Sequence, residues 1–356
     1  MDGCFYKGER VLVTGHTGFK GTWLTMILNA LGAEVVGYSD GELSGESLHK
    51  LVRPHTYATV WGDICDLDLL KETITKYRIR YVIHMAAQTI VQIGMHQPYE
   101  TFRVNAMGGA AVLEAVNQCP SVTGLLFATT DKVYRNDGQP VPFSEDHPLW
   151  ATTPYAASKC CAELMVQTYY ETCWKNRTIG VTVVRAGNVI GGGDFAPYRI
   201  IPDCVRSWRK GEPIALRNPE AVRPYQHVLD ALFAYLRILQ GVCTDSSQFS
   251  AYNVGLDWKE NCTTKKLMEL FFDSLNAAPS VQLCDQEKKF TEDLLLVLNS
   301  EKLWTDLKYT PLWDLRQAID KTAEWYRVWT QGGNVHQCCL EQIEAHMAGK
   351  GVYYGE

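Results

Sequence analysis

The sequence predicts an α/β fold, in which a doubly wound parallel sheet is joined to a smaller mixed C-terminal domain. Its N-terminal part reads as strand, glycine turn, helix and strand, which is a βαβ unit. Later apolar runs, "RYVIHMAAQ" and "TGLLFATT", end on small or polar residues, as strands do where a sheet binds ligands. A chain of 356 residues, 46% of them hydrophobic and 21% charged, is long enough to bury such a core.

The first strand, "RVLVTG", ends on a glycine, and Gly15, Gly18 and Gly21 follow in a G-x-x-G-x-x-G spacing. Apolar residues then recur at helical spacing over 23–31, and Gly32 is a natural stop before the strand "EVVGY". Glycine lets the backbone approach a pyrophosphate at a helix N-terminus, whose dipole favours an anion. We therefore predict a Rossmann-type dinucleotide site here, in preference to a tight turn without a ligand.

An acidic residue, Asp40, lies at the end of the second predicted strand, about 20 residues past the glycines, where a carboxylate accepts the adenosine ribose hydroxyls. The same carboxylate would repel a 2′-phosphate, and no arginine stands beside it. We therefore predict NAD rather than NADP. Asp63, after the strand "TVWG", is expected near the adenine, and the small residues Ala86 and Ala87 would let a cofactor lie across their strand end.

A later helix, beginning "PYAASKCCAEL", carries Tyr155 and Lys159 on one face, after Pro154 in its first turn. A lysine cation beside a tyrosine favours the phenolate, so we expect the pKa of Tyr155 to fall toward working pH. A group that takes a proton from an alcohol while NAD takes the hydride needs that tuning. The alternative is a surface Tyr–Lys pair on an amphipathic helix, but the glycine loop and the "TTDK" at 129–132 favour catalysis.

The composition argues against several classes of protein. A net charge of −6 gives no reason to expect nucleic-acid or membrane binding. No apolar stretch approaches the roughly 20 residues of a membrane helix, and the N-terminus does not read as a signal peptide, so we expect a cytoplasmic protein. The 12 cysteines are scattered without the spacing of a zinc site, so we expect reduced thiols and no metal.

Several longer motifs occur in one order along the chain: "VLVTGHTGFKG", "HMAAQ", "TTDK", "PYAASK", "RAGNVIGGGDF" and "LRNPEAVRPYQHV". Together they resemble the extended short-chain dehydrogenase/reductase superfamily, and within it most of all the CDP-glucose 4,6-dehydratases. The resemblance runs from Phe5 to about Trp329. It implies a homodimeric lyase of deoxysugar and polysaccharide biosynthesis that holds NAD tightly and converts CDP-glucose to CDP-4-keto-6-deoxyglucose.

The resemblance also implies a role for each central residue. Tyr155 would remove the C4 hydroxyl proton while NAD accepts the C4 hydride, with Thr130 hydrogen-bonded to the same oxygen. Asp131 would protonate the leaving C6 hydroxyl, and Lys132 would take the C5 proton, where relatives acting on other nucleotide sugars commonly have Asp–Glu. Burial favours both the protonated acid and the neutral lysine, whereas an ion pair between them would oppose both, and consecutive residues on an extended strand point apart.

The same resemblance implies the binding residues. The cofactor set comprises Gly15, Thr17, Gly18, Phe19, Gly21, Asp40, Asp63, Ile64, Ala86, Ala87, Gln88, Asn105, Tyr155 and Lys159. Candidate substrate-binding residues are Asn188, in a glycine-rich turn, and Arg217 and Arg223, whose guanidinium forks suit phosphate. We expect an NAD-binding Rossmann domain at 1–185 that also receives roughly 226–257, and a sugar-nucleotide-binding domain at 186–225 and 258–356.

Three segments depart from the family pattern: "GQPVPFSE" at 138–145, "WATTPY" at 150–155 and "GELSGESLHKLV" at 41–52. The first two lie beside the predicted sugar pocket, and they leave the hexose and the nucleotide base open. A 4-epimerase or a decarboxylase of nucleotide sugars would also oxidise C4 with Tyr155 and NAD. A non-enzymatic NAD-binding protein is a further alternative, against which the intact Tyr155–Lys159 pair argues. By resemblance, helices 97–118 and 154–174 form the face between subunits.

Overall fold

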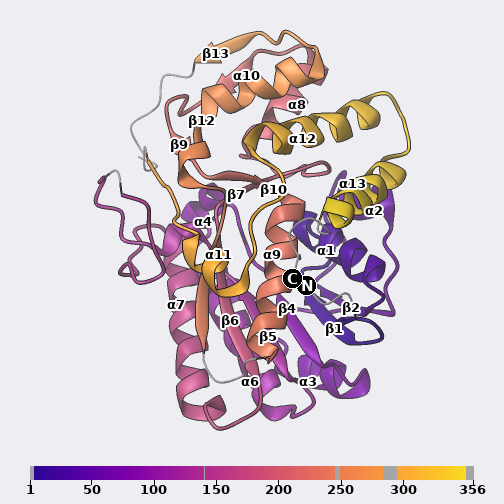
Figure 1. Cartoon of the computed structure of the whole chain (residues 1–356), viewed down its shortest axis with the longest axis vertical. Helices are drawn as coiled ribbons and strands as arrows, with labels where there is room; N and C mark the ends of the chain where they lie inside the picture. The colour runs from indigo at the N-terminus through magenta and orange to yellow at the C-terminus, as the bar shows by residue number, and fades with distance from the viewer. Residues whose placement is uncertain (1–3, 140, 245–248, 284–294, 350–356) are drawn as a thin grey trace.

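The computed structural model describes residues 4–139, 141–244, 249–283 and 295–349 (Figure 1). Its centre is a seven-stranded sheet in the order β11-β6-β5-β4-β1-β2-β3, and every neighbouring pair is parallel. The strands are β1 (Arg10–Thr14), β2 (Glu34–Ser39), β3 (Ala58–Trp61), β4 (Tyr81–His84), β5 (Gly124–Ala128), β6 (Gly180–Ala186) and β11 (Ser250–Val254). This arrangement confirms the predicted α/β fold and its doubly wound parallel sheet.

The strand order reverses at β1. The chain runs from β1 to β2 and β3 on one side, and then returns to place β4 on the other side of β1. In open α/β sheets the crevice at such a reversal, outside the carboxyl ends of the strands, is where ligands bind. The glycine turn after β1 opens onto this crevice.

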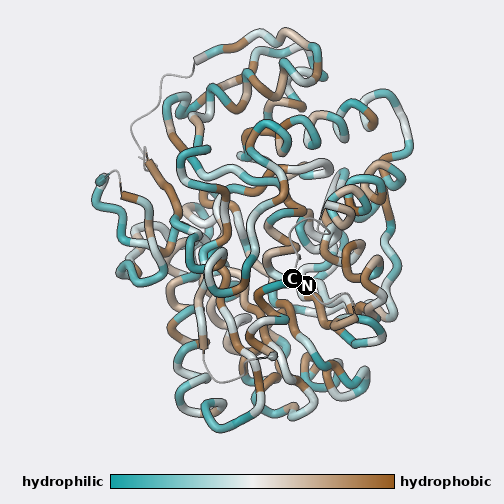
Figure 2. Tube along the Cα trace, viewed as in Figure 1, coloured by the Kyte–Doolittle hydropathy of each residue, from teal (hydrophilic) through white to brown (hydrophobic). Residues whose placement is uncertain are grey.

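Helices cover both faces of the sheet. In chain order, the helices of the described residues are α1 (Phe19–Ala30), α2 (Leu48–Val52), α3 (Leu67–Lys76), α4 (Val91–His96), α5 (Pro98–Phe102), α6 (Gly108–Gln118), α7 (Pro154–Tyr169), α8 (Ile200–Lys210), α9 (Val228–Thr244), α10 (Thr264–Leu275), α11 (Glu301–Leu307), α12 (Leu315–Thr330) and α13 (Val335–Gly349), of which α8, α10 and α12 belong to the smaller part described below. Val11 and Val13 face the core that contains Leu24 of α1, whereas Leu12 between them faces the core that contains Val112 of α6. Because both faces are buried, β1 reads as a continuous apolar run. Figure 2 shows the apolar residues gathered along the strands and the inner helices.

A smaller, mixed part lies at the carboxyl edge of the sheet, toward the top of Figure 1, and contains α8, α10 and α12. Its short strands pair two by two: β7 (Asn188–Ile190) with β10 (Tyr225–His227), β8 (Ile214–Leu216) with β13 (Val281–Leu283), and β9 (Val222–Arg223) with β12 (Cys262–Thr263). The last pair is antiparallel and the other two are parallel. The division into two domains at the predicted boundaries stays a prediction.

The C-terminal helix α13 packs back onto the larger part of the molecule. His346 of α13 lies 2.9 Å from the Asp230 carboxylate of α9, and its ring stacks on Phe233 at 4.5 Å. Asp230 also accepts a hydrogen bond from the backbone N–H of Leu312 at 2.6 Å. Helix α9 is therefore held between the sheet and the C-terminal segments. Across the ranges described above, no helix combines the length and the apolar character that crossing a membrane requires.

Candidate active site

The turn between β1 and α1 depends on two glycines, Gly15 and Gly21, at which an added Cβ would force other backbone atoms to move. Gly15 has φ of +74°, and a Cβ atom there would lie 2.9 Å from the Ala86 backbone. A Cβ on Gly21 would lie 2.1 Å from the carbonyl oxygen of Gly15. Gly18 precedes α1 without any side-chain cap, so the first amides of the helix point into the crevice. A close backbone, small residues and open amides at a helix N-terminus fit the pyrophosphate of a dinucleotide.

The floor of this crevice is fixed by Thr14 at the end of β1. Its hydroxyl oxygen accepts the backbone N–H groups of Met85 (3.1 Å) and Ala86 (3.2 Å) and lies 2.8 Å from Nδ1 of His84. Burial lowers the pKa of His84 to about 3, so the imidazole is neutral. With two donors already on its oxygen, Thr14 donates its own proton to Nδ1. The chain leaving β4 is thereby held against β1.

The predicted ribose residue, Asp40, is exposed at the end of β2. Next to it, the Ser39 hydroxyl lies 2.9 Å from Nδ1 of the buried His16, and Thr17 donates to the Gly41 carbonyl at 3.0 Å. Burial lowers the pKa of His16 to about 4, so this side chain is also neutral. The predicted residues Thr17 and Asp40 therefore lie together at one end of the crevice.

Asp63 and Ile64 follow β3, on the same side of the crevice. Asp63 accepts hydrogen bonds from the backbone N–H of Cys65 (2.9 Å) and from Arg103 (2.8 Å), and these bonds hold its pKa below the usual range. Ile64 is buried against Gly108, where a Cβ would lie 2.4 Å from the isoleucine side chain. The sequence did not point to Arg103, which neutralises Asp63.

The buried Asn105 links the loop after β4 to α7. Its amide oxygen accepts the backbone N–H of Gln88 at 2.8 Å, and its amide nitrogen donates to the Gln88 carbonyl at 3.0 Å and to Ser158 at 2.9 Å. Ser158 precedes Lys159 in the chain. The predicted residues Gln88 and Asn105 thus sit where the crevice meets the Tyr–Lys helix, whereas Phe19 lies against Gly191.

Tyr155 and Lys159 are both buried on α7, which begins at Pro154 after a Thr153 cap. Burial raises the pKa of Tyr155, and a side-chain hydrogen bond with Thr130 opposes that rise. The Nζ of Lys159 donates to the Ala128 carbonyl at 3.1 Å, and burial lowers its pKa to about 8. The expected fall in the Tyr155 pKa is therefore wrong, because burial penalises the phenolate more than the neighbouring groups favour it.

The segment after β5 forms a short 3-10 turn, Asp131–Val133, rather than an extended strand end. The Thr130 hydroxyl accepts the backbone N–H of Lys132 (3.3 Å) and donates to Asp131 (3.0 Å). Asp131 is buried, and burial raises its pKa. Its second carboxylate oxygen has no hydrogen-bond partner among the described residues, and no ion pair within them joins Asp131 to the half-buried Lys132. The acid and the lysine are thus neighbours without being paired.

Two cations at this site were missed in the sequence. Lys20 lies in the first turn of α1, and burial, together with the charges of Arg199 and Lys159, lowers its pKa to about 7, whereas Asp131 opposes that fall. Arg199, just before α8, favours the Tyr155 phenolate and lies 3.8 Å from the buried Asp194. A lysine in the first turn of a helix is a signal that could have been read, because the helix dipole disfavours a cation there.

The three candidate substrate-binding residues lie in the smaller part of the molecule. Arg223 of β9 is buried, and its charge acts on Asp131. Arg217 follows β8, stacks over Tyr198 at 5.4 Å and lies 3.9 Å from Asp203. Asn188 begins β7 and is half-buried. The structure therefore brings Arg223 to the 130–132 turn and places Arg217 farther out, beside the residue that precedes Arg199.

Comparisons with known proteins agree on one family. The model of the family described as GDP-mannose 4,6 dehydratase matches residues 12–322. The chain is 34% identical to the CDP-glucose 4,6-dehydratase of Salmonella typhimurium, over 98% of this chain and 99% of that protein. It is 26% identical to the dTDP-D-glucose 4,6-dehydratase of Homo sapiens, over 90% of each chain.

Two similar solved structures contain NAD. The dTDP-glucose 4,6-dehydratase of Streptomyces venezuelae, with NAD bound, is 25% identical with a TM-score of 0.79, covering 91% of this chain and 98% of that one. The UDP-glucose 4-epimerase of Thermus thermophilus in complex with NAD is 27% identical with a TM-score of 0.77, covering 89% of this chain and 99% of that one.

Proposed function

Because the chain belongs to the CDP-glucose 4,6-dehydratase family, within the extended short-chain dehydrogenase/reductase superfamily, we propose that it converts CDP-glucose to CDP-4-keto-6-deoxyglucose. It is an NAD-dependent enzyme that dehydrates a nucleotide sugar across C5 and C6. The choice of CDP-glucose is supported by the 34% identity to a CDP-glucose enzyme, against 26% to a dTDP-glucose enzyme over a similar length.

One observation carries the proposed mechanism, which is that the groups for oxidation and for elimination meet at Thr130. The hydroxyl of Thr130 opposes the rise in the pKa of Tyr155 on α7, and it donates to the Asp131 carboxylate at 3.0 Å. A hexose whose C4 hydroxyl meets Tyr155 would therefore place its C6 hydroxyl beside the next residues of the turn. Simple C4 oxidation does not need that second set of groups.

When held at the β1–α1 turn, NAD would supply the hydride acceptor for C4 and the hydride donor for C6. In the first step, Tyr155 removes the C4 hydroxyl proton, and Thr130 holds the same oxygen. Since the pKa of Lys159 is about 8, the side chain is mainly a cation at pH 7 and stabilises the phenolate as it forms. Arg199 contributes a second positive charge to that phenolate.

In the second step, the C4 ketone acidifies the C5 proton and water leaves across C5 and C6. Lys132 takes the C5 proton, and Asp131 gives its proton to the departing C6 hydroxyl. Burial of Asp131, which raises its pKa, supports this assignment, because an acid must hold a proton before it can donate one. The C5 proton then returns as the hydride arrives at C6, so the reaction loses one water and leaves no net redox change.

The proposal is tested by incubating the NAD-loaded protein with CDP-, dTDP-, UDP- and GDP-hexoses and measuring the molecular masses of the products by mass spectrometry. We expect CDP-glucose to lose one water fastest. A product of unchanged mass would identify a 4-epimerase, and no reaction with any of the sugars would refute an enzymatic function.

Two variants assign the steps. Tyr155→Phe removes the base, so we expect turnover to fall by about 10²- to 10⁴-fold. Tyr169→Phe on the same helix, whose hydroxyl donates to Glu114 at 2.9 Å, is the matched control. Asp131→Asn is expected to form the 4-ketone without losing water. Unchanged turnover in Tyr155→Phe would contradict the mechanism.

A further inference from the structure

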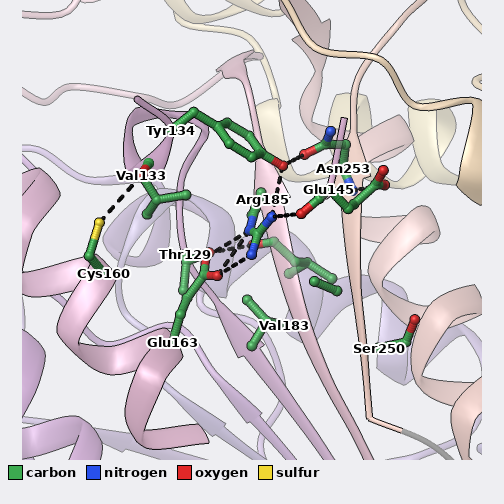
Figure 3. Close-up of polar contacts among 12 residues, drawn as sticks. Thr129, Val133, Tyr134, Glu145, Cys160, Glu163, Val183, Arg185, Ser250 and Asn253 are labelled. Carbon is green, nitrogen blue, oxygen red and sulfur yellow. Dashed lines mark hydrogen bonds and ion pairs between the residues drawn. The ribbon is translucent and has the colours of Figure 1, made fainter. Parts of the chain in front are cut away.

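A buried ion pair lies behind the 130–132 turn, and the mechanism above does not use it (Figure 3). The side chains of Arg185 (β6) and Glu163 (α7) are only 7% and 4% exposed. The guanidinium Nε donates to both carboxylate oxygens, at 3.0 and 2.9 Å, and Nη2 donates to one of them at 2.5 Å. Such a planar, two-pronged contact fixes both groups in direction as well as distance.

The residue before the 130–132 turn, Thr129, is hydrogen-bonded to Glu163 of this pair. The Thr129 hydroxyl donates to Oε1 of Glu163 at 2.6 Å. The backbone N–H of Thr129 donates to the Val184 carbonyl at 2.9 Å, so the residue is held by α7 and β6 together. Thr129 directly precedes Thr130, where oxidation and elimination meet.

Tyr134, which follows the turn, is hydrogen-bonded to Arg185 of the pair. Arg185 Nη1 donates to the Tyr134 hydroxyl and to the Glu145 carbonyl, both at 2.9 Å. Tyr134 in turn donates to the side-chain oxygen of Asn253 at 2.6 Å. Figure 3 shows Arg185 between Glu163 on one side and Tyr134 and Glu145 on the other.

We propose that Glu163 and Arg185 are positioning residues for dehydration, which hold residues 130–132 in line with the sugar by fixing Thr129 before them and Tyr134 after them. The proposal rests on the proposed function. The Thr130 hydroxyl shapes the turn locally through Asp131 and Lys132, but three residues of 3-10 helix do not fix where the turn lies. Its position therefore depends on how its two ends are held.

The ion pair is better explained by geometry than by stability. Replacing a buried ion pair with well-packed apolar residues is often neutral or stabilising, so its presence is weak evidence for a stabilising role. A shift of about 1 Å at a reacting group, in contrast, can change a rate about a hundredfold. The network contacts the residues on both sides of the 130–132 turn, Thr129 and Tyr134. The groups that act on the Tyr155 phenol are different ones, Thr130 and Arg199.

The test uses variants that loosen each end of the turn and keep the ion pair. Thr129→Val removes the hydroxyl that meets Glu163, and Tyr134→Phe removes the hydroxyl between Arg185 and Asn253. Both variants leave the Glu163 side chain in place, so it still opposes the fall in the pKa of Lys159. The other titratable groups that face Lys159, His84 and Lys20, are also untouched. Oxidation at C4, whose base Tyr155 lies on α7 outside the turn, should then be slowed less than dehydration.

Matched controls remove the same groups elsewhere. Thr322→Val deletes a buried hydroxyl that donates to the Ala318 carbonyl at 2.7 Å, and Tyr6→Phe deletes one that donates to Leu236 at 2.7 Å. All four variants are loaded with NAD, mixed with CDP-glucose, quenched at short times and analysed by mass. Thermal melting of each variant reports any general loss of structure.

We expect Thr129→Val and Tyr134→Phe to slow water loss by about tenfold to a hundredfold and to slow C4 oxidation less, so that the oxidised, undehydrated sugar accumulates. The two control variants should not accumulate the oxidised, undehydrated sugar, even if their melting temperatures equal those of the test variants. If both test variants dehydrate the sugar as fast as wild type, or slow both steps equally, the positioning role is wrong. A wild-type protein that never releases a dehydrated sugar would instead refute the proposed function.

Discussion

At the scale of single residues, burial acts in opposite directions on the two central side chains of α7. It raises the pKa of Tyr155 and lowers the pKa of Lys159, because each change favours the uncharged form. Catalysis needs the reverse, a phenolate beside a cation. Thr130 and Arg199 oppose the effect at the tyrosine, and Glu163 opposes it at the lysine. The site therefore holds a charge that the fold would not keep for stability alone.

This conflict predicts that Lys159→Met is more stable than wild type at pH 7. The pKa of Lys159 falls from 10.5 to about 8 on folding, so below pH 8 a charged group is buried at a cost of about 3 kcal/mol. Losing the hydrogen bond to Ala128 offsets about 1 kcal/mol, which leaves a gain of about 2 kcal/mol. Urea unfolding measures the gain, and activity should be lost.

The pH dependence distinguishes this cause from better packing. Between pH 8 and 10.5 the unfolded chain binds more protons than the folded one, so wild-type stability rises with pH relative to the variant. The advantage of Lys159→Met should therefore shrink toward about pH 10. Lys265→Met, at an exposed position of α10, is the control and should show no such trend. An advantage that stays constant with pH would contradict the explanation.

The placement of Tyr155 and Lys159 on one helix face could be predicted from the sequence, whereas the effect of burial on their pKa values could not. Tyr155 and Lys159 stand four apart in a helix, and local spacing is enough to bring them to one face. Burial, however, depends on every segment that packs around the site. Arg199 acts on Tyr155 from 44 positions along the chain (199 − 155), and no local pattern announces such a contact.

At the scale of elements, the β1–α1 turn depends on one close approach between backbone atoms. Gly21 lies inside α1, where alanine would normally stabilise a helix by up to about 1 kcal/mol. Here the added Cβ would lie 2.1 Å from the Gly15 carbonyl oxygen, so the turn must move. We predict that Gly21→Ala weakens NAD binding by about tenfold or more, equivalent to about 1.4 kcal/mol. Isothermal titration of the cofactor-free protein with NAD measures the loss.

The control for this substitution is Gly255→Ala, beyond the end of β11. Its added Cβ would meet the Ser300 hydroxyl at 3.5 Å, which is ordinary contact, and its φ lies outside the left-handed region. NAD affinity should therefore stay at the wild-type value. Equal affinities for Gly21→Ala and wild type would mean that the turn can move without disturbing the cofactor.

The turn after β5 shows where prediction of an element stops. Apolar residues over 124–128 predict the strand, and the structure has β5 there. The 3-10 turn that follows was not predicted, because its partners are remote: Thr129 bonds a residue 34 positions away, and Tyr134 bonds one 51 positions away. We expected Asp131 and Lys132 to point to opposite sides of an extended strand. The structure instead places them at two successive positions of one 3-10 turn.

At the scale of the whole molecule, the larger sheet could be predicted and the smaller part could not. The residues that define each βαβ unit are consecutive in the sequence, as a strand, a turn and an amphipathic helix. The parallel sheet therefore follows from the order of the units. In the smaller part, strands of two or three residues pair across long separations, as Ile214 does with Val281. Such short strands have too little sequence to reveal a period.

The molecule also presents apolar side chains on the helices that we expect at a homodimer interface. Tyr99 of α5, Met107 at the turn before α6, and Leu164 of α7 are 81%, 61% and 57% exposed. The predicted helix 97–118 is realised as α5, a π-helical turn over Arg103–Met107 and α6. Exposed apolar residues on neighbouring helices are typical of a surface that another chain covers.

We therefore predict that Met107→Glu combined with Leu164→Glu yields a monomer, because a stable interface of about 1,600 Å² does not accommodate unpaired carboxylates at its apolar centre. Light scattering coupled to gel filtration measures the mass. Leu51→Glu, at an apolar position on α2 that is 37% exposed, is the control and should leave a dimer. If wild type and the double variant have the same mass, these helices do not join two subunits. Since α7 also carries Tyr155 and Lys159, separating the subunits should lower activity as well as mass.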